Sequence, residues 1–222
     1  MPRESNILEY SYNKNKFDLI TKPYFLYKIT MCDEKQIDIS KWVKNLDDSL
    51  KIRFEDYAIS HMFIKLGNIE LTKNKRVLWD IFVEDNCQEK YNRYENGIYL
   101  ITYNDYIVKI GGTKVGMKGR ICSYQCGHCI PERKKRNGEN YPGKMSVTNA
   151  YIYNTIYQYL IEGRGKFEMY YYSIEDIIVQ KEIFGKMCEF KVQCYDEYEK
   201  KALEIYKSQV GEFPILSDNS HP

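Results

Sequence analysis

Two neighbouring stretches carry the clearest hydrophobic pattern in the chain. The runs GIYLITY (97–103) and YIVKIGG (106–112) are rich in β-branched and aromatic residues, which is typical of strands. Between them lie Asn104 and Asp105, two residues that suit a tight turn. The pattern predicts a β-hairpin, and a hairpin can bring one residue from each strand together on one face.

Helical spacing follows the hairpin in two segments. Residues 115–125 predict a helix, in spite of two glycines that lower its helical propensity. Residues 146–163 have apolar positions three and four apart, with Thr148 as a candidate N-cap and Gly163 at the end. We therefore expect a helix in both places.

The last two elements complete the pattern. Residues 166–174 predict a third strand, and residues 196–211 predict an amphipathic helix with acidic residues in its first turn and Gly211 at its close. The order is strand, strand, helix, helix, strand, helix. It predicts an α/β (α+β) fold with a small central antiparallel three-stranded sheet flanked by helices.

The pattern is less regular before the hairpin. Residues 53–67 have near-helical spacing and predict a helix closed by Gly67. Residues 76–85 are apolar and short, so strand and helix both remain open.

A polar stretch at residues 85–96 is the best candidate for a domain boundary. We expect an N-terminal region over residues 1–95 that contacts DNA or forms a dimer surface. Residues 96–222 would then form the catalytic domain.

Composition places the chain among ordinary globular proteins. It has 222 residues, of which 43% are hydrophobic and 29% charged, with a net charge of +2. No apolar run is long enough for a membrane helix, and the N-terminus lacks the apolar core of a secretory signal. These features predict a cytoplasmic protein with no membrane association. Seven cysteines, an odd number, argue against a complete disulfide framework.

Positive charge is concentrated in one turn-rich run at residues 131–144. Most such runs are solvated loops, but a basic cluster beside a candidate active site suits contacts to DNA phosphates. The candidate DNA-binding residues are Arg133, Lys134, Lys135, Arg136 and Lys144.

The CGHC sequence at residues 126–129 has the spacing of a disulfide isomerase motif. It follows a helical segment and has no preceding tryptophan, which disfavours a redox role. A zinc site that includes Cys122 and His128, completed by Cys188 or Cys194, lacks a clean second ligand pair. We expect reduced structural thiols.

A few residues near the hairpin could carry chemistry together. A Lys109 ammonium beside the Tyr99 hydroxyl would lower the pKa of the phenol and favour the phenolate. Arg120 lies eleven residues after Lys109 on the predicted helix, with Tyr124 one turn further along the same face. A guanidinium at that position can hold a phosphate through two hydrogen bonds.

The order of these residues resembles the GIY-YIG nuclease superfamily. Gly97-Ile98-Tyr99 and Lys109-Ile110-Gly111 stand at the two motifs that name it, followed by Arg120 and Tyr124. Lys109 stands where most members have tyrosine. This variant resembles the branch that includes some type II restriction endonucleases.

The resemblance implies one acidic metal ligand on the last helix, followed three and four residues later by apolar residues. Glu199 fits this pattern, with Ala202 and Leu203 in those places. Glu197 and Glu204 lack the apolar pair and are weaker candidates.

The mechanism implied by the resemblance is hydrolysis of a phosphodiester bond in double-stranded DNA. Tyr99 would be the general base, assisted by Lys109, while Arg120 would neutralise charge on the phosphate. Glu199 would hold Mg²⁺ (or Mn²⁺), which normally binds one carboxylate together with substrate oxygens. A restriction enzyme of this kind is expected to be a two-fold symmetric homodimer.

Each of these residues alone has an ordinary structural explanation, such as a sheet tyrosine or a surface ion pair. Their joint appearance in the right order on the right elements favours the nuclease. The alternatives are a homing, repair or virally encoded nuclease of the same type, or a DNA-binding module of the same fold that does not cleave.

Overall fold

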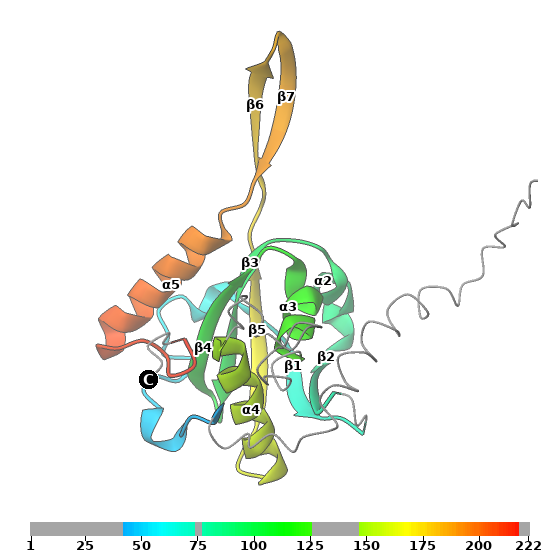
Figure 1. Cartoon of the computed structure of the whole chain (residues 1–222). Helices are drawn as coiled ribbons and strands as arrows, with labels where there is room; N and C mark the ends of the chain where they lie inside the picture. Colours follow the sequence, from blue (N-terminus) through cyan, green and yellow to red (C-terminus); the bar gives the residue numbers. More distant parts are fainter. Residues whose placement is uncertain (1–41, 74–76, 126–146, 218–222) are drawn as a thin grey trace, which may run out of the picture. The chain divides into compact units, whose positions relative to one another are not determined.

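The structure is a computed structural model that describes residues 42–73, 77–125 and 147–217 (Figure 1). The chain divides into two units between residues 37 and 38, and every described residue belongs to the second. The boundary expected near residue 95 falls inside this unit, because strands before and after it pair in one sheet. The DNA-contacting or dimerising role of residues 1–95 stays a prediction.

Five antiparallel strands form the main sheet, in the order β2-β1-β5-β3-β4. The three strands predicted from the sequence are neighbours in it, and the region before residue 95 adds two more. The predicted class, a mixed α/β fold with an antiparallel sheet flanked by helices, is confirmed, but the sheet is larger than expected. The strands are β1 (Ile64–Leu71), β2 (Trp79–Val83), β3 (Gly97–Tyr103), β4 (Tyr106–Thr113) and β5 (Phe167–Ser173).

The β3–β4 hairpin is confirmed, with β4 at the edge of the sheet. Its turn residues Asn104 and Asp105 both adopt positive φ, at 49° and 71°, which matches the twist of a two-residue hairpin turn. In the register of the hairpin, Tyr99 lies opposite Gly111, and Ile101 lies opposite Lys109. Residues opposite one another share a face, so Tyr99 and Lys109 are diagonal neighbours on one face.

The helix predicted over residues 53–67 is wrong. A single 3₁₀ turn, η3 (Ser60–Met62), leads directly into β1. The pairing of β1 with β5 shifts register between Lys65 and Gly67, so buried residues fall three apart along this strand and imitate helical spacing. Gly67 permits a close approach of β2, since a Cβ there would lie 2.1 Å from the Phe82 carbonyl oxygen.

Helices cover both faces of the sheet. The predicted helices are found as α3 (Gly116–Gln125), α4 (Val147–Ile161) and α5 (Tyr195–Val210). Helix α4 already begins at Val147, so Thr148 lies inside it and is not the N-cap. Helix α5 ends as expected at Gly211, whose φ is +86°. Shorter pieces are η2 (Asp47–Ser49), η4 (Asp85–Cys87) and α2 (Gln88–Asn92).

The two faces carry separate hydrophobic clusters. Side chains of α3 and α4 pack with Tyr99 and Ile101 in one cluster. Ala202 and Tyr206 of α5 pack with Ile98 and Leu100 in the other. The sheet is therefore the middle layer between α3 and α4 on one side and α5 on the other.

A second, two-stranded sheet was not anticipated. Strands β6 (Ile177–Ile183) and β7 (Lys186–Val192) form a hairpin, which Figure 1 shows as a separate ribbon after β5. Its turn residues Phe184 and Gly185 have positive φ. Nearly all of its residues are exposed to solvent.

Within the described ranges, no helix is both long and apolar enough to cross a membrane.

Candidate active site

One guanidinium joins two tyrosines at the centre of the candidate site. Arg120 Nε donates a hydrogen bond to the Tyr99 hydroxyl (2.8 Å), and Arg120 Nη2 donates to the Tyr124 hydroxyl (3.2 Å). The two hydroxyls are also hydrogen-bonded to each other. Strand β3 and helix α3 thus bring together three of the five residues proposed from the sequence as catalytic.

Ring contacts fix this arrangement further. The rings of Tyr99 and Tyr124 meet edge to face, with centroids 6.2 Å apart. The guanidinium carbon of Arg120 lies 4.5 Å from the centroid of the Tyr124 ring, within the range of a cation–π contact. Both tyrosines are fully buried, so this side of the site is rigid and preorganised.

Gly111 provides the space that the Tyr99 side chain occupies. A Cβ at this position would lie 2.3 Å from the Tyr99 hydroxyl oxygen and 2.5 Å from Cζ of the ring. The sequence places Gly111 and Gly112 only at the end of the second predicted strand, 106–112. The structure instead gives each a close neighbour in the site, which strand spacing alone does not reveal.

The pKa of Tyr99 is raised well above its ordinary value. Burial is the main cause and the neighbouring Tyr124 adds to it, while the positive charge of Arg120 acts in the opposite direction. The lowering expected from Lys109 is not found, and Tyr99 is a neutral phenol in the free protein. Burial lowers the pKa of the Arg120 guanidinium, but Tyr99 and Tyr124 raise it by more. The guanidinium therefore remains charged.

Lys109 is a buried lysine at the edge of the sheet. Burial lowers the pKa of its amine to about 8, the Glu199 carboxylate opposes that shift, and Arg120 adds to it. No hydrogen bond or ion pair joins its amine to any residue in the described part of the chain. The charges of Arg120 and Glu199 therefore act on Lys109 in opposite directions, and its pKa of about 8 lies near neutral pH.

Glu199 reaches the site from α5, on the other face of the sheet. Its carboxylate lies over β4, because a Cβ on Gly112 would be 2.6 Å from Glu199 Oε2. It is half-buried and forms no ion pair within the described ranges. Of the weaker candidates, Glu204 is paired with Lys201 (3.3 Å) and Glu197 is exposed. Glu199 is thus the acidic residue of α5 that is best placed to bind a cation.

The ligand set fits a hard cation that takes most of its ligands from substrate and water. Among the described residues, no three His, Cys, Asp or Glu side chains gather into a metal cluster. One unpaired carboxylate beside a substrate phosphate is the usual protein contribution to a Mg²⁺ site. The same finding gives no support to a zinc site that includes Cys122, Cys188 and Cys194.

Several predicted residues lie outside the described ranges. These are the CGHC sequence and the five basic residues proposed for DNA binding, Arg133, Lys134, Lys135, Arg136 and Lys144. Their proposed roles stay predictions.

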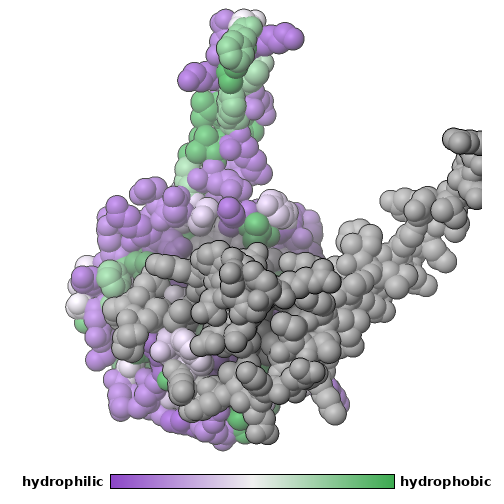
Figure 2. Space-filling view, in the orientation of Figure 1, coloured by the Kyte–Doolittle hydropathy of each residue, from purple (hydrophilic) through white to green (hydrophobic). Residues whose placement is uncertain are grey.

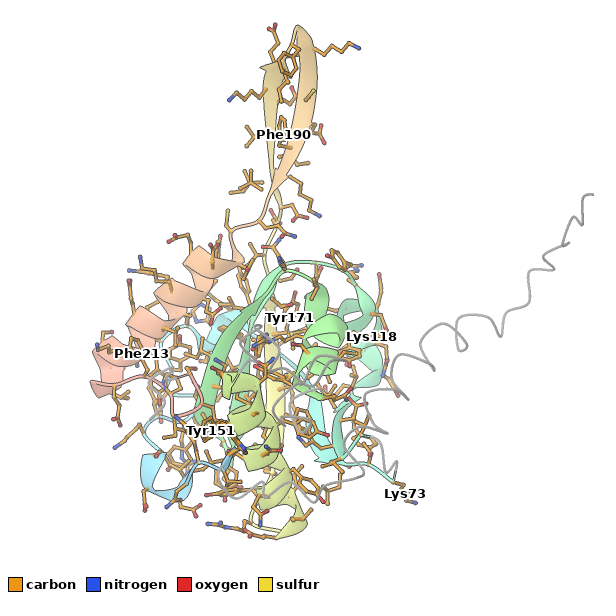
Figure 3. All side chains as sticks on the ribbon, in the orientation of Figure 1. Lys73, Lys118, Tyr151, Tyr171, Phe190 and Phe213 are labelled. Atoms are coloured by element: carbon orange, nitrogen blue, oxygen red, sulfur yellow. The ribbon has the colours of Figure 1, made fainter. Side chains whose placement is uncertain are left out.

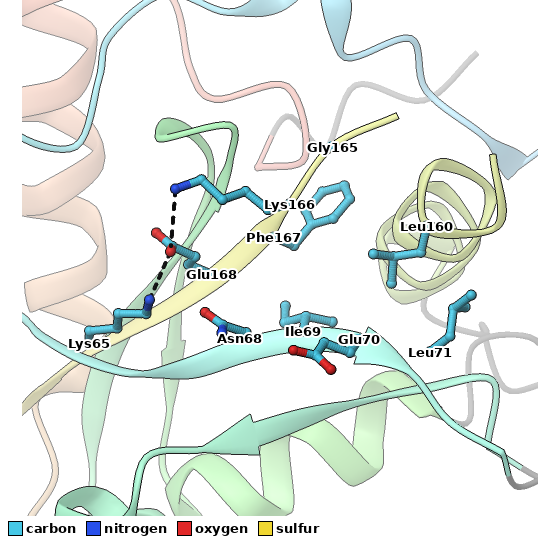
Figure 4. A pocket seen from close by; sticks show the side chains of 10 residues that line it. All are labelled: Lys65, Asn68, Ile69, Glu70, Leu71, Leu160, Gly165, Lys166, Phe167 and Glu168. Atoms are coloured by element: carbon cyan, nitrogen blue, oxygen red, sulfur yellow. Dashed lines mark hydrogen bonds and ion pairs between the residues drawn. The ribbon is translucent and has the colours of Figure 1, made fainter. Parts of the chain in front are cut away.

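A hollow of about 500 Å³ lies elsewhere, between β1, β5 and the end of α4 (Figure 4). The Glu168 carboxylate at its side pairs with Lys65 (2.8 Å) and Lys166 (3.6 Å). None of the five candidate catalytic residues lines it. Of its four charged side chains, Lys65, Lys166 and Glu168 pair with one another, and Glu70 is exposed to solvent.

No protein-family model matches the chain, and no curated protein matches it. Among solved structures, it is similar to restriction endonuclease HPY188I in complex with product DNA, with 21% identity and a TM-score of 0.48. That alignment covers 82% of this chain and 95% of the other. It is also similar to a mutant of bacteriophage T4 EndoII, with 20% identity and a TM-score of 0.46, over 70% of this chain and 96% of the other.

Proposed function

We propose that this chain is a metal-dependent DNA endonuclease of the GIY-YIG type. The observation that carries the proposal is the bridge from Arg120 to the hydroxyls of Tyr99 and Tyr124. This bridge brings the Arg120 guanidinium and two tyrosine hydroxyls together beside Lys109. These residues follow one another along the chain in the order that resembles the GIY-YIG superfamily.

Arg120 is suited to hold the phosphate. A guanidinium has five N–H donors, and the two tyrosines engage only two of them. The remaining donors can bind phosphate oxygens while the bonds to the tyrosines hold the guanidinium in place. A rigid cation aimed at the developing negative charge stabilises the transition state more than the ground state.

Tyr99 and Lys109 divide the handling of the proton. Because Tyr99 is a neutral phenol in the free protein, its role is to orient the attacking water by a hydrogen bond. Lys109, with a pKa of about 8, has a substantial neutral fraction near physiological pH and accepts the proton. The water oxygen attacks phosphorus, the bond from phosphorus to the leaving oxygen breaks, and the leaving oxygen takes its proton from solvent.

Glu199 would hold the divalent cation, Mg²⁺ or Mn²⁺. When bound, the cation supplies charge neutralisation at the phosphate and the leaving oxygen. The unpaired, half-buried state of this carboxylate supports that assignment.

We propose further that the enzyme is site-specific, of the type II restriction class, and acts in the cytoplasm as a homodimer. Two copies related by a two-fold axis would present one site to each DNA strand.

The test is cleavage of supercoiled plasmid DNA in Mg²⁺ by wild type, Tyr99→Phe and Tyr171→Phe. Tyr171 is a matched control, because it pairs with Tyr99 in the neighbouring strand β5 and is equally buried. We expect Tyr99→Phe to lose at least about 100-fold in rate and Tyr171→Phe to stay within a few-fold of wild type. Equal rates for all three proteins would refute the assignment of Tyr99.

A further inference from the structure

The β6–β7 hairpin has two unequal faces. Its register pairs Ile177 with Val192 and Val179 with Phe190, and residues paired in this way point to the same face. Six of the eight residues on this face, which we call the apolar face, are hydrophobic or cysteine: Ile177, Val179, Ile183, Cys188, Phe190 and Val192. The other face holds mainly polar residues, namely Gln180, Glu182, Glu189 and Lys191, with Ile178 and Met187.

The hairpin is the main site of exposed hydrophobic surface in the described part of the chain. It contains seven of the fifteen large hydrophobic residues that are exposed there. On the apolar face, Ile177 is 50% exposed and Phe190 is 40% exposed. Figure 2 shows hydrophobic surface along the hairpin, and Figure 3 shows Phe190 on it, apart from the core around Tyr171.

Such a surface needs a partner. A two-stranded hairpin is only marginally stable in water unless its hydrophobic face packs against something. Contiguous exposed apolar surface on a folded protein usually marks an interaction site. Nucleic acid is a poor occupant, because DNA interfaces are polar and this face is mostly hydrocarbon.

Charge indicates that the partner is a second copy of this chain. The apolar face has two charged residues, Lys181 and Lys186, both in the half near the turn and both without an ion pair in the described structure. The base of the hairpin is acidic, with exposed Glu175 on one side and Asp196 and Glu197 on the other. Two hairpins packed in opposite directions would place the lysines of each copy beside the acidic base of the other.

We propose that two copies of this chain associate through the apolar faces of their β6–β7 hairpins, packed antiparallel about a two-fold axis. Such an isologous contact is self-complementary in both hydrophobicity and charge. This contact would form the homodimer suggested under the proposed function. The association does not require cleavage activity, and the test below measures association.

The size of the contact sets the expected affinity. Two strands of seven residues present a face of roughly 20 Å by 10 Å. A contact of this size is smaller than the interfaces of stable dimers, so we expect weak, reversible dimerisation with a dissociation constant of roughly 100 micromolar order. The lysine–carboxylate rim should make the association weaker at high salt.

Sedimentation equilibrium of the full chain over a range of concentrations tests the proposal. The informative pair is Val179→Asp and Ile178→Asp, since both residues are exposed and β-branched but lie on opposite faces of the same strand. We expect Val179→Asp to weaken the dimer at least about tenfold and Ile178→Asp to change it by less than about twofold. Neither residue is in the core, so circular dichroism should show both variants folded like wild type.

A second measurement does not depend on introducing charge. Cys188 lies near the middle of the apolar face, so antiparallel packing brings it close to its own copy in the partner. A short bifunctional maleimide should cross-link wild type into a dimer that contains a linked Cys188–Cys188 peptide, detected by mass spectrometry, and Cys188→Ser should lose that peptide.

Four results would overturn the proposal. The first is a monomer at every concentration, and the second is equal weakening by the two aspartate variants. The third is a cross-linked dimer of wild type in which no Cys188–Cys188 peptide is found. Loss of DNA binding by Val179→Asp with no change in association would also overturn it, in favour of a nucleic-acid surface.

Discussion

Replacing Gly111 with alanine should separate the Tyr99 hydroxyl from its partners. The new Cβ would lie 2.3 Å from the hydroxyl oxygen and 2.5 Å from Cζ, distances at which one of the two groups must move. The backbone of β4 is fixed by pairing with β3, so we expect the Tyr99 ring to rotate away. It would then lose the 2.8 Å hydrogen bond from Arg120 Nε.

Two costs set the size of the effect. Overpacking a buried site costs about 1–3 kcal/mol, and loss of a hydrogen bond to a charged donor costs about 1.5–3 kcal/mol. Rotation of the ring relieves the steric overlap but breaks the hydrogen bond, so we expect the free energy of unfolding to fall by about 2–4 kcal/mol. Urea denaturation measures this loss, and plasmid cleavage should fall by about 100-fold or more, since a misplaced catalytic group is highly damaging.

Gly112→Ala is the matched control. Its Cβ would meet Glu199 Oε2 at 2.6 Å and the Tyr195 ring at 2.7 Å, not Tyr99. We expect this variant to require more Mg²⁺ for half-maximal cleavage while the Tyr99 pairing stays intact. Wild-type stability and cleavage in Gly111→Ala would refute the assigned role of the Tyr99–Arg120 contact.

Three further predictions concern stability. Burial lowers the pKa of Lys109 from 10.5 to about 8, so between these pH values the unfolded chain binds more protons than the folded one and stability should rise with pH. At pH 7, Lys109→Met should therefore be up to about 3 kcal/mol more stable than wild type in urea denaturation. At pH 10 this gain should be smaller. Gly211→Ala should cost about 1 kcal/mol in thermal denaturation, because the positive φ alone opposes it, with nothing within 4 Å of the new Cβ. Burial raises the pKa of Glu168, but Lys65 and Tyr170 outweigh it and hold the pKa below its ordinary value. Glu168→Gln should therefore lower the free energy of unfolding by about 2 kcal/mol at pH 7 in urea denaturation. This difference from wild type should shrink as the pH falls below about 4, where the carboxylate is protonated.

Local sequence signals were sufficient where a segment's own pattern decides its structure. The β3–β4 hairpin has β-branched runs on both sides of Asn104-Asp105, and the turn adopts the positive φ angles that these residues tolerate. Helix α5 has an apolar face and a glycine that closes it in the left-handed conformation. In both places local propensity and tertiary packing agree.

Non-local pairing explains the failures. The register shift at Lys65 gave β1 a three-residue spacing, which reads as helical in the sequence. Its pairing with β5, about 100 residues away, is what makes it a strand and places it in the same sheet as β3 and β4. The β6–β7 hairpin has only a weak signal in the sequence, because its first strand does not alternate between apolar and polar residues and Phe184-Gly185 is not a common turn pair.

The candidate site was predictable as a set of residues but not as a set of interactions. The sequence paired Tyr99 with Lys109, whereas the structure pairs it with Arg120 and Tyr124. Burial decides the charge of Tyr99 and the pKa of Lys109, and burial depends on packing from several distant elements. No motif spacing contains that information.

The proposed function requires that this chain cleave DNA with a cation held by Glu199. The direct measurement is incubation of supercoiled plasmid with wild type, Glu199→Ala and Glu204→Ala, each with and without Mg²⁺. We expect Mg²⁺-dependent cleavage by wild type and Glu204→Ala, and its loss in Glu199→Ala. Cleavage by Glu199→Ala at the wild-type rate, or intact plasmid with every protein, would contradict it.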